Sequence, residues 1–188
     1  NYVWISPRVD GQVTEVFVTE HQRVQAGDDL FRLDATPFAA LLEKATSAEL
    51  LVTQDIQVQM AAVHAAEAKV REQQANVDQA KAQFERILKL VKRGDEAKLR
   101  GIEVEDAYKA AQATLDDLLA ELDLARKTLG PSQVQQARID EAAAAVQLAT
   151  LNVDWTLVKA PADGWVTRLA LRPGDVVQTA DQLFVLVE

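Results

Sequence analysis

Apolar residues recur at alternating spacings of three and four through a long central segment of the chain. Counting in sevens from Leu42 gives a mostly apolar line that reaches Val91, and a parallel line runs from Ala45 to Ile87. This heptad pattern predicts a long helix that pairs with another helix as a coiled coil. Residues 38–93 contain no glycine or proline, as expected of one unbroken helix.

A second set of apolar lines follows after a polar turn. The line from Val104 to Leu129 predicts a second helix, which Gly130-Pro131 separates from a third helix. The outgoing and returning arms have nearly equal lengths, so the pattern predicts an antiparallel hairpin with its tip at about 93–102 and a break at 130–131. A three-helix bundle folded at Gly130 is the alternative.

The two ends of the chain carry the same short motif. Shifting residues 11–34 by 153 positions places them on residues 164–187 with nine identical pairs. The shared pattern is a glycine, alternating apolar residues, a turn and Leu-Phe-x-Leu, which predicts strands. Each copy has too few apolar residues to form a core alone, so the two copies are expected to pack together. The expected core draws on both copies: Val13, Val16, Leu30, Phe31, Leu33, Val166, Leu169, Leu183, Phe184 and Leu186.

These patterns predict an α+β protein in which a helical hairpin is inserted between two halves of a β domain. The expected boundaries are 1–35 for the first half, 36–157 for the hairpin and 158–188 for the second half. Trp155 and Trp165 are expected in the core or at the foot of the β domain.

Composition removes several classes of function. The chain has 20 Lys and Arg against 29 Asp and Glu, a net charge of −9, which disfavours nucleic-acid binding. It contains no cysteine, which excludes disulfides, thiolate catalysis and cysteine-bound zinc. His21 and His64 stand far apart without a second histidine at ligand spacing, and no catalytic or phosphate-binding motif occurs. We therefore predict no enzyme activity, no cofactor and no metal site.

Short motifs at both ends resemble those of the HlyD/EmrA-type membrane fusion proteins, also called periplasmic adaptor proteins. Residues 6–13, SPRVDGQV, resemble the opening of the lipoyl-like domain in that family. Residues 158–166, VKAPADGWV, resemble the start of its second half, and residues 172–177, RPGDVV, resemble its turn. The resemblance covers the whole chain in order: half of a β-sandwich lipoyl-like domain, a coiled-coil hairpin, and the other half.

The resemblance implies a subunit that links an inner-membrane transporter to an outer-membrane channel for drug efflux or secretion in Gram-negative bacteria. It implies a transporter of the major facilitator or ABC type, a TolC-like channel, and self-association into a ring of three or six copies. The expected location is the periplasm, with an inner-membrane anchor supplied by a segment missing from this chain.

The family also implies a contact with the channel at the hairpin tip. Its members often carry an arginine and, four residues later, a leucine there, and Arg86 and Leu90 fit these two positions. Arg93 and Arg100 complete the expected contact set. The family's serine beyond the turn has no counterpart, because no serine lies between Ser47 and Ser132. Residues 85–103 hold six Lys and Arg and four Asp and Glu, so the tip is basic within an acidic chain.

Two other functions remain open. A lipoyl or biotinyl carrier would need a lysine on an exposed turn between the two halves, and Lys159 is the candidate, although it precedes Ala160-Pro161 at the expected foot of the hairpin. A purely structural coiled-coil protein would use the heptads but would give the duplicated β halves no role.

Overall fold

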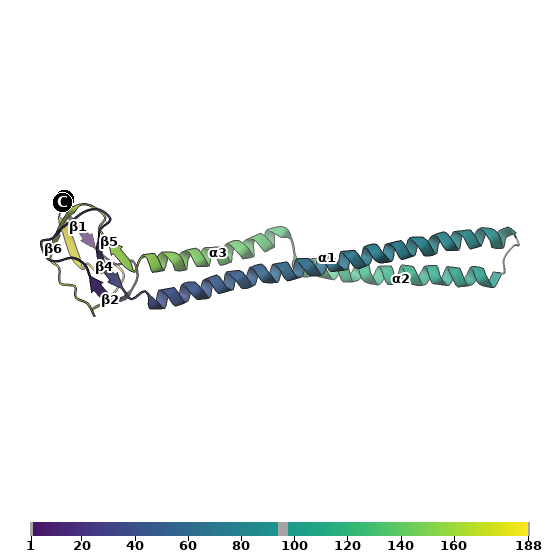
Figure 1. Ribbon diagram of the computed structural model, residues 1–188, viewed down its shortest axis with the longest axis horizontal. Helices are drawn as coiled ribbons and strands as arrows, with labels where there is room; N and C mark the ends of the chain where they lie inside the picture. Colours follow the sequence, from purple (N-terminus) through teal and green to yellow (C-terminus); the bar gives the residue numbers. More distant parts are fainter. Residues whose placement is uncertain (1, 94–97, 188) are drawn as a thin grey trace. The chain divides into compact units, whose positions relative to one another are not determined.

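The computed structural model describes residues 2–93 and 98–187, and the expected tip residues 94–97 lie outside this description. Within the described ranges the chain forms eight strands and three helices (Figure 1). In chain order they are β1 (Tyr2–Ile5), β2 (Gly11–Val16), β3 (Arg23–Val24), β4 (Asp29–Leu33), α1 (Thr36–Arg93), α2 (Lys98–Leu129), α3 (Ser132–Asp154), β5 (Leu157–Lys159), β6 (Gly164–Thr167), β7 (Val176–Val177) and β8 (Phe184–Val187).

The chain divides into two compact units. We call Asn1–Leu50 with Asp140–Glu188 the β unit, and Leu51–Ile139 the helical unit. The fold class is the predicted one: a long antiparallel helical hairpin is inserted between the two halves of a β domain.

The helical unit is held together along the predicted apolar lines. The buried residues of α1 all lie on those two lines: Ile56, Val63, Ala66, Val77 and Ile87. Ion pairs between α1 and α2 follow the same antiparallel pairing. Lys69 bonds to Glu121 at 2.9 Å, and Arg126 bonds to Glu67 at 2.8 Å. Exposed ion pairs of this kind contribute little free energy, so the narrow apolar seam is the main source of stability.

The break between α2 and α3 falls at Gly130 and Pro131. Gly130 has φ of 72°, a left-handed conformation that favours glycine, and its N–H donates to the Arg126 carbonyl at 3.0 Å. Beyond the break, Arg138 of α3 donates to Asp55 of α1 at 2.8 Å. Because α2 contacts α1 nearer the hairpin end, α2 and α3 follow one another along α1. The three-helix bundle is therefore not the observed arrangement.

The β unit consists of two four-stranded sheets that exchange strands between the halves of the repeat. One sheet has the order β1-β8-β6-β3 and the other has the order β5-β4-β2-β7. Each sheet takes two strands from the N-terminal half and two from the C-terminal half. Neither half can complete a sheet by itself, which agrees with the expectation that the two copies pack together.

Hydrogen bonds also connect the turns of the two halves. Asp10 accepts hydrogen bonds from the backbone N–H and the hydroxyl of Thr179, and Asp163 accepts one from the Ala26 N–H at 2.8 Å. Asp10 and Asp163 are equivalent under the shift of 153, and so are Ala26 and Thr179. These bonds hold the pKa of Asp10 below its usual value, chiefly through the Thr179 hydroxyl and then its N–H.

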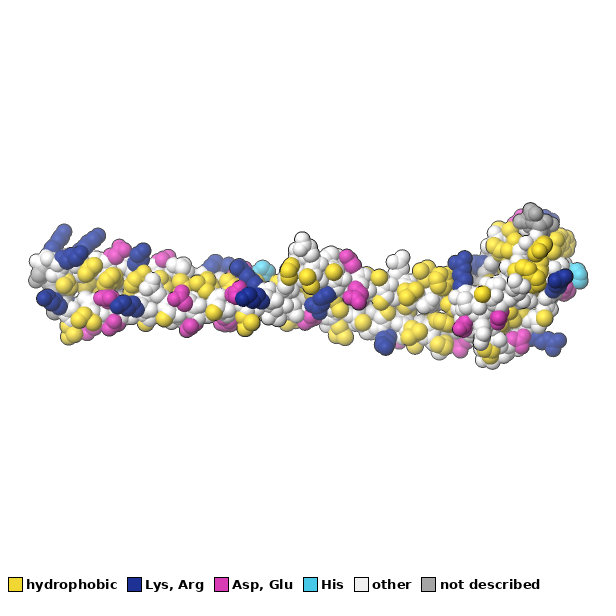
Figure 2. Space-filling model, turned by 180° about the vertical axis from the view of Figure 1, so that it is seen from behind, with side chains coloured by type: hydrophobic (Ala, Val, Ile, Leu, Met, Phe, Trp, Pro, Cys, Tyr) yellow, Lys and Arg dark blue, Asp and Glu magenta, His cyan; other side chains and the backbone are white. Residues whose placement is uncertain are grey.

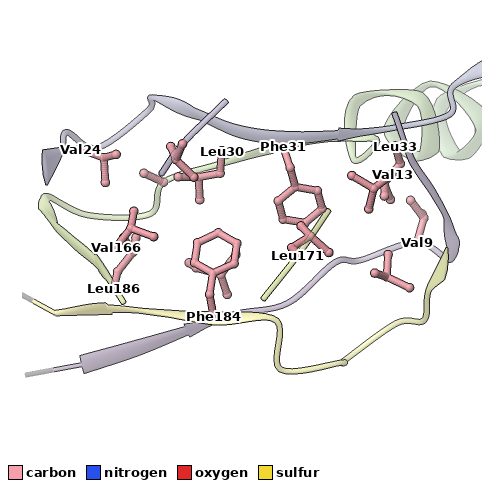
Figure 3. Close-up of a cluster of buried hydrophobic side chains, with 14 residues drawn as sticks. Val9, Val13, Val24, Leu30, Phe31, Leu33, Val166, Leu171, Phe184 and Leu186 are labelled. Carbon is pink, nitrogen blue, oxygen red and sulfur yellow. The ribbon is translucent and has the colours of Figure 1, made fainter. Parts of the chain in front are cut away.

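The core of the β unit lies between the two sheets (Figure 3). Phe31 and Phe184 meet there edge to face, with ring centroids 6.2 Å apart. Of the ten expected core positions, seven are buried: Val13, Leu30, Phe31, Leu33, Val166, Phe184 and Leu186. Val16, Leu169 and Leu183 are half-buried and pack against this core.

Trp165 does not lie in the core. Its side chain is 52% exposed, because the alternation along β6 directs Gly164 and Val166 inward and Trp165 outward. The expectation for this residue was therefore wrong. Trp155 is half-buried at the edge of the core, and the Arg8 guanidinium lies over its ring at 5.7 Å.

Substitution by alanine is expected to change stability differently at the two equivalent glycines, Gly11 and Gly164. A Cβ on Gly164 would lie 2.8 Å from the Val187 carbonyl oxygen, whereas a Cβ on Gly11 would make an ordinary 3.5 Å contact with Leu33. Gly164→Ala is expected to reduce the free energy of unfolding by about 1–3 kcal/mol, the usual range for overpacking. Gly11→Ala is the matched control and should change it much less. Denaturant unfolding followed by tryptophan fluorescence measures both, and equal losses would contradict the assignment of the close contact.

Candidate functional site

The candidate contact surface is the end of the helical hairpin, which we call the hairpin end and define as residues 86–93 of α1 and 98–103 of α2. Arg86, Leu90 and Arg93 are spaced by four and three residues, so they lie on one face of α1. The two arginines are exposed, and Leu90 is half-buried.

The opposite side of α1 is occupied by α2. Phe84 stacks on Tyr108 with ring centroids 6.0 Å apart, and Ile87 is buried. Gly101 of α2 lies beside Val91 of α1, and a Cβ there would make an ordinary 3.5 Å contact with Val91 Cγ2. This packing fixes the rotation of α1 and leaves the Arg86 face turned away from the partner helix.

The start of α2 adds apolar surface that sequence reasoning missed. Arg100 is exposed as expected, but Leu99 and Ile102 beside it are also more than half exposed. Large apolar side chains at the end of a helical pair have no role in the seam between the helices. Their position directly after the predicted turn, before the apolar line begins at Val104, was the available signal.

The hairpin end gathers positive charge. Its cations are Arg86, Lys89, Lys92, Arg93, Lys98 and Arg100, and Figure 2 shows dark blue side chains concentrated there. The nearby acids in the described ranges are Glu85 and Glu103, while Asp95 and Glu96 lie outside them. Cations together with exposed apolar side chains suit contact with a protein surface that presents both acids and apolar groups.

The carrier candidate Lys159 has a different setting from a modified lysine on a turn. It is the last residue of β5, is paired with Asp29 of β4 in the sheet, and its Nζ lies 3.4 Å from Asp29 Oδ1. Lys159 therefore lies within a paired strand, whereas a carrier lysine needs an exposed turn.

In the part of the chain that the structure describes, no three His, Asp or Glu side chains come together as ligands for a metal ion. Nor does any helix within residues 2–93 and 98–187 combine the length and hydropathy needed to cross a bilayer.

Comparison with known proteins gives one family and several relatives. The family model described as RND MFP, barrel-sandwich hybrid domain (MFP, membrane fusion protein) matches residues 1–188. The multidrug resistance protein MdtN of Shigella flexneri is 27% identical over 98% of this chain and 56% of its own length. The multidrug export protein EmrA of Escherichia coli is 28% identical over 100% of this chain and 48% of its own length.

Among solved structures, a candidate efflux transporter from Bacteroides eggerthii superposes with a TM-score of 0.53 at 20% identity. The match covers 100% of this chain and 39% of that one. This likeness supports the fold. The chain spans about half the length of the known relatives that it matches.

Proposed function

Because the chain belongs to the RND membrane fusion protein family, through its barrel-sandwich hybrid domain, we propose that it is the central part of a periplasmic adaptor. In this proposal it links an inner-membrane transporter of the major facilitator or ABC type to a TolC-like outer-membrane channel, for drug efflux or secretion. The longer protein is held at the inner membrane, and this part lies in the periplasm. The role is mechanical, and family membership favours it over a carrier or a purely structural coiled coil.

The hairpin end supplies the contact with the channel. The observation that carries this proposal is the exposure of cations and large apolar side chains together on residues that the seam does not use, with Leu90 between Arg86 and Arg93. The family's tip serine is absent, so apolar and cationic contacts from Leu99, Ile102 and Arg100 would take its place.

Self-association into a ring of three or six copies completes the proposal. Apolar side chains stand exposed along the helical unit, among them Leu51 and Val58 of α1 and Leu124 of α2. The seams that α1 forms with α3 and α2 leave these side chains exposed. Exposed apolar patches are typical of surfaces that bind a partner. Neighbouring hairpins would cover them.

Cross-linking in intact cells tests the contact. This chain contains no cysteine, so a single cysteine at Leu90 of the full-length protein would be the only reactive site that this segment contributes. We expect Leu90→Cys to capture an outer-membrane protein. Leu124→Cys, on the same hairpin, is the control and should capture other copies of the adaptor. If Leu90→Cys captures only copies of itself, the proposed contact with the channel is wrong.

A further inference from the structure

The outward face of the sheet β1-β8-β6-β3 is apolar. The strand register aligns Tyr2, Val187 and Trp165 in one row across the sheet, and Trp4, Val185 and Thr167 in the next. Residues directly opposite each other in antiparallel strands share a face. Tyr2 is 70% exposed, and Trp4, Trp165 and Val187 are exposed as well. Three of the ten Phe, Trp and Tyr residues of the chain therefore lie on one small surface.

The internal repeat shows that the fold does not require this apolar face. Under the shift of 153, Val185 corresponds to Arg32, Val187 to Asp34 and Trp165 to Gln12. These equivalents belong to the other half of the repeat, and all three are polar. The apolar outward surface of β6 and β8 is therefore not shared by the equivalent strands of the other half.

A groove runs along β8 on this face. It has a volume of about 560 Å³ and is lined by Tyr2, Trp4, Thr167, Arg168, Val185 and Val187. Val185 is only 5% exposed although it faces outward, so it forms the floor between side chains of β1 and β6. The groove is open to solvent on one side, and its volume lies within the range of small-molecule sites.

Arg168 is held at the groove by an unusual backbone. Its φ is 63°, a left-handed conformation that is rare for arginine. The Glu20 carboxylate stabilises the turn by accepting the backbone N–H groups of Arg168 at 2.8 Å and Leu169 at 2.6 Å. These bonds, Leu169 first, keep the pKa of Glu20 below its usual value.

Among the residues that the structure describes, no acidic side chain forms an ion pair with Arg168. In the other half of the repeat, the equivalent position is Glu15, which pairs with Arg32 at 3.2 Å. In this half the equivalent residues are Arg168 and Val185, which cannot form an ion pair. A ligand with a negative charge would complement the positive charge of Arg168 at the groove.

We propose that this groove binds an amphiphilic organic anion. Its apolar body, aromatic or acyl, lies on Val185 and Val187 between the side chains of β1 and β6, and its carboxylate or sulfonate pairs with Arg168. The volume of the groove limits the ligand to a small molecule. This proposal is independent of the adaptor function.

A pair of fluorescent probes with similar rings tests the proposal on the 188-residue chain. One is the anion 1-anilinonaphthalene-8-sulfonate, and the other is the neutral N-phenyl-1-naphthylamine. We expect Arg168→Gln to weaken binding of the anion about tenfold. This loss corresponds to the lower end of the range for one hydrogen bond to a charged group. Binding of the neutral probe should not change. Trp4→Ala should weaken both probes, and dodecanoate below its micelle concentration should displace the anion.

Arg32→Gln is the matched control, because it removes an arginine from the equivalent sheet without touching the groove. It should leave the affinities for both probes unchanged, and melting curves establish that each variant is folded. Equal binding of the two probes, or an unchanged anion affinity in Arg168→Gln, overturns the proposal. So does binding to phosphatidylglycerol vesicles without displacement by dodecanoate, which would make the face a membrane surface. Self-association that blocks the anion would assign the face to a second copy.

Discussion

Replacing Phe184 with alanine is expected to lower the free energy of unfolding of the β unit by about 3–5 kcal/mol. The Phe184 side chain is completely buried and meets the Phe31 ring edge to face. Phe184 begins β8, which pairs with both β1 and β6. Its removal leaves a cavity between the two sheets, at the point where strands from the two halves of the repeat join. Such a loss is a large fraction of a typical domain's stability.

Tryptophan fluorescence measures this loss specifically. Trp4, Trp155 and Trp165 all belong to the β unit, so denaturant unfolding followed by their emission is not dominated by the long helices. Val176→Ala is the control, since Val176 is 76% exposed and its truncation should change the free energy by less than about 0.5 kcal/mol. An unchanged midpoint in Phe184→Ala would contradict its central place in the core.

Replacing Leu90 with aspartate is expected to abolish transport by the full-length protein in cells. In the proposed contact Leu90 enters an apolar site on the channel, where a buried leucine contributes roughly 1.5–3 kcal/mol. An aspartate there would lose this contribution and add an unpaired charge that must be desolvated. It would also reduce the positive charge of the hairpin end, which attracts an acidic partner.

The transport measurement is growth in the presence of the exported compound, with adaptor levels checked in the same cells. Leu90→Met keeps the volume and hydrophobicity and should retain transport. Because Leu90 is half-buried, the helical content and melting of the 188-residue Leu90→Asp chain must also match the wild type. Normal transport by a well-expressed Leu90→Asp protein would remove Leu90 from the contact.

The helices were the more predictable part of this fold. A heptad places one side chain per turn in the seam, so the sequence lines identify the buried face directly, and all five buried residues of α1 lie on them. The helix break follows equally directly from Gly130 and Pro131, since one can adopt a left-handed conformation and the other cannot continue a helix.

The strand pairing was less predictable. The repeat shows that two segments adopt the same local structure, but it does not say whether each pairs within its own half or with the other. The exchange is set by long-range partners such as Tyr2 and Val187, which no local pattern specifies. Trp165 was misplaced for a related reason: its size suggested the core, whereas the alternation along β6 directs it outward.

At the hairpin end, the charge and the Arg86 face could be anticipated from residue spacing. The position of Leu99 and Ile102 before Val104 was a signal for their exposure, but it did not suffice. Their exposure also depends on where α2 begins and how it is rotated against α1. That rotation is set by packing between Phe84 and Tyr108 and between Gly101 and Val91.

The exchange of strands between the halves has a consequence for the order of folding. During synthesis the N-terminal strands emerge first, yet β1 must wait for β8, which is made last. Joining such distant strands is slow, because loop closure costs entropy before any contact compensates it. Pairing of α1 with α2 and α3 uses nearer partners and would shorten that loop by bringing Thr36 and Asp154 towards each other. The hairpin would then act as an internal folding template, and changes that weaken its seam should slow formation of the β unit while leaving its final stability almost unaltered.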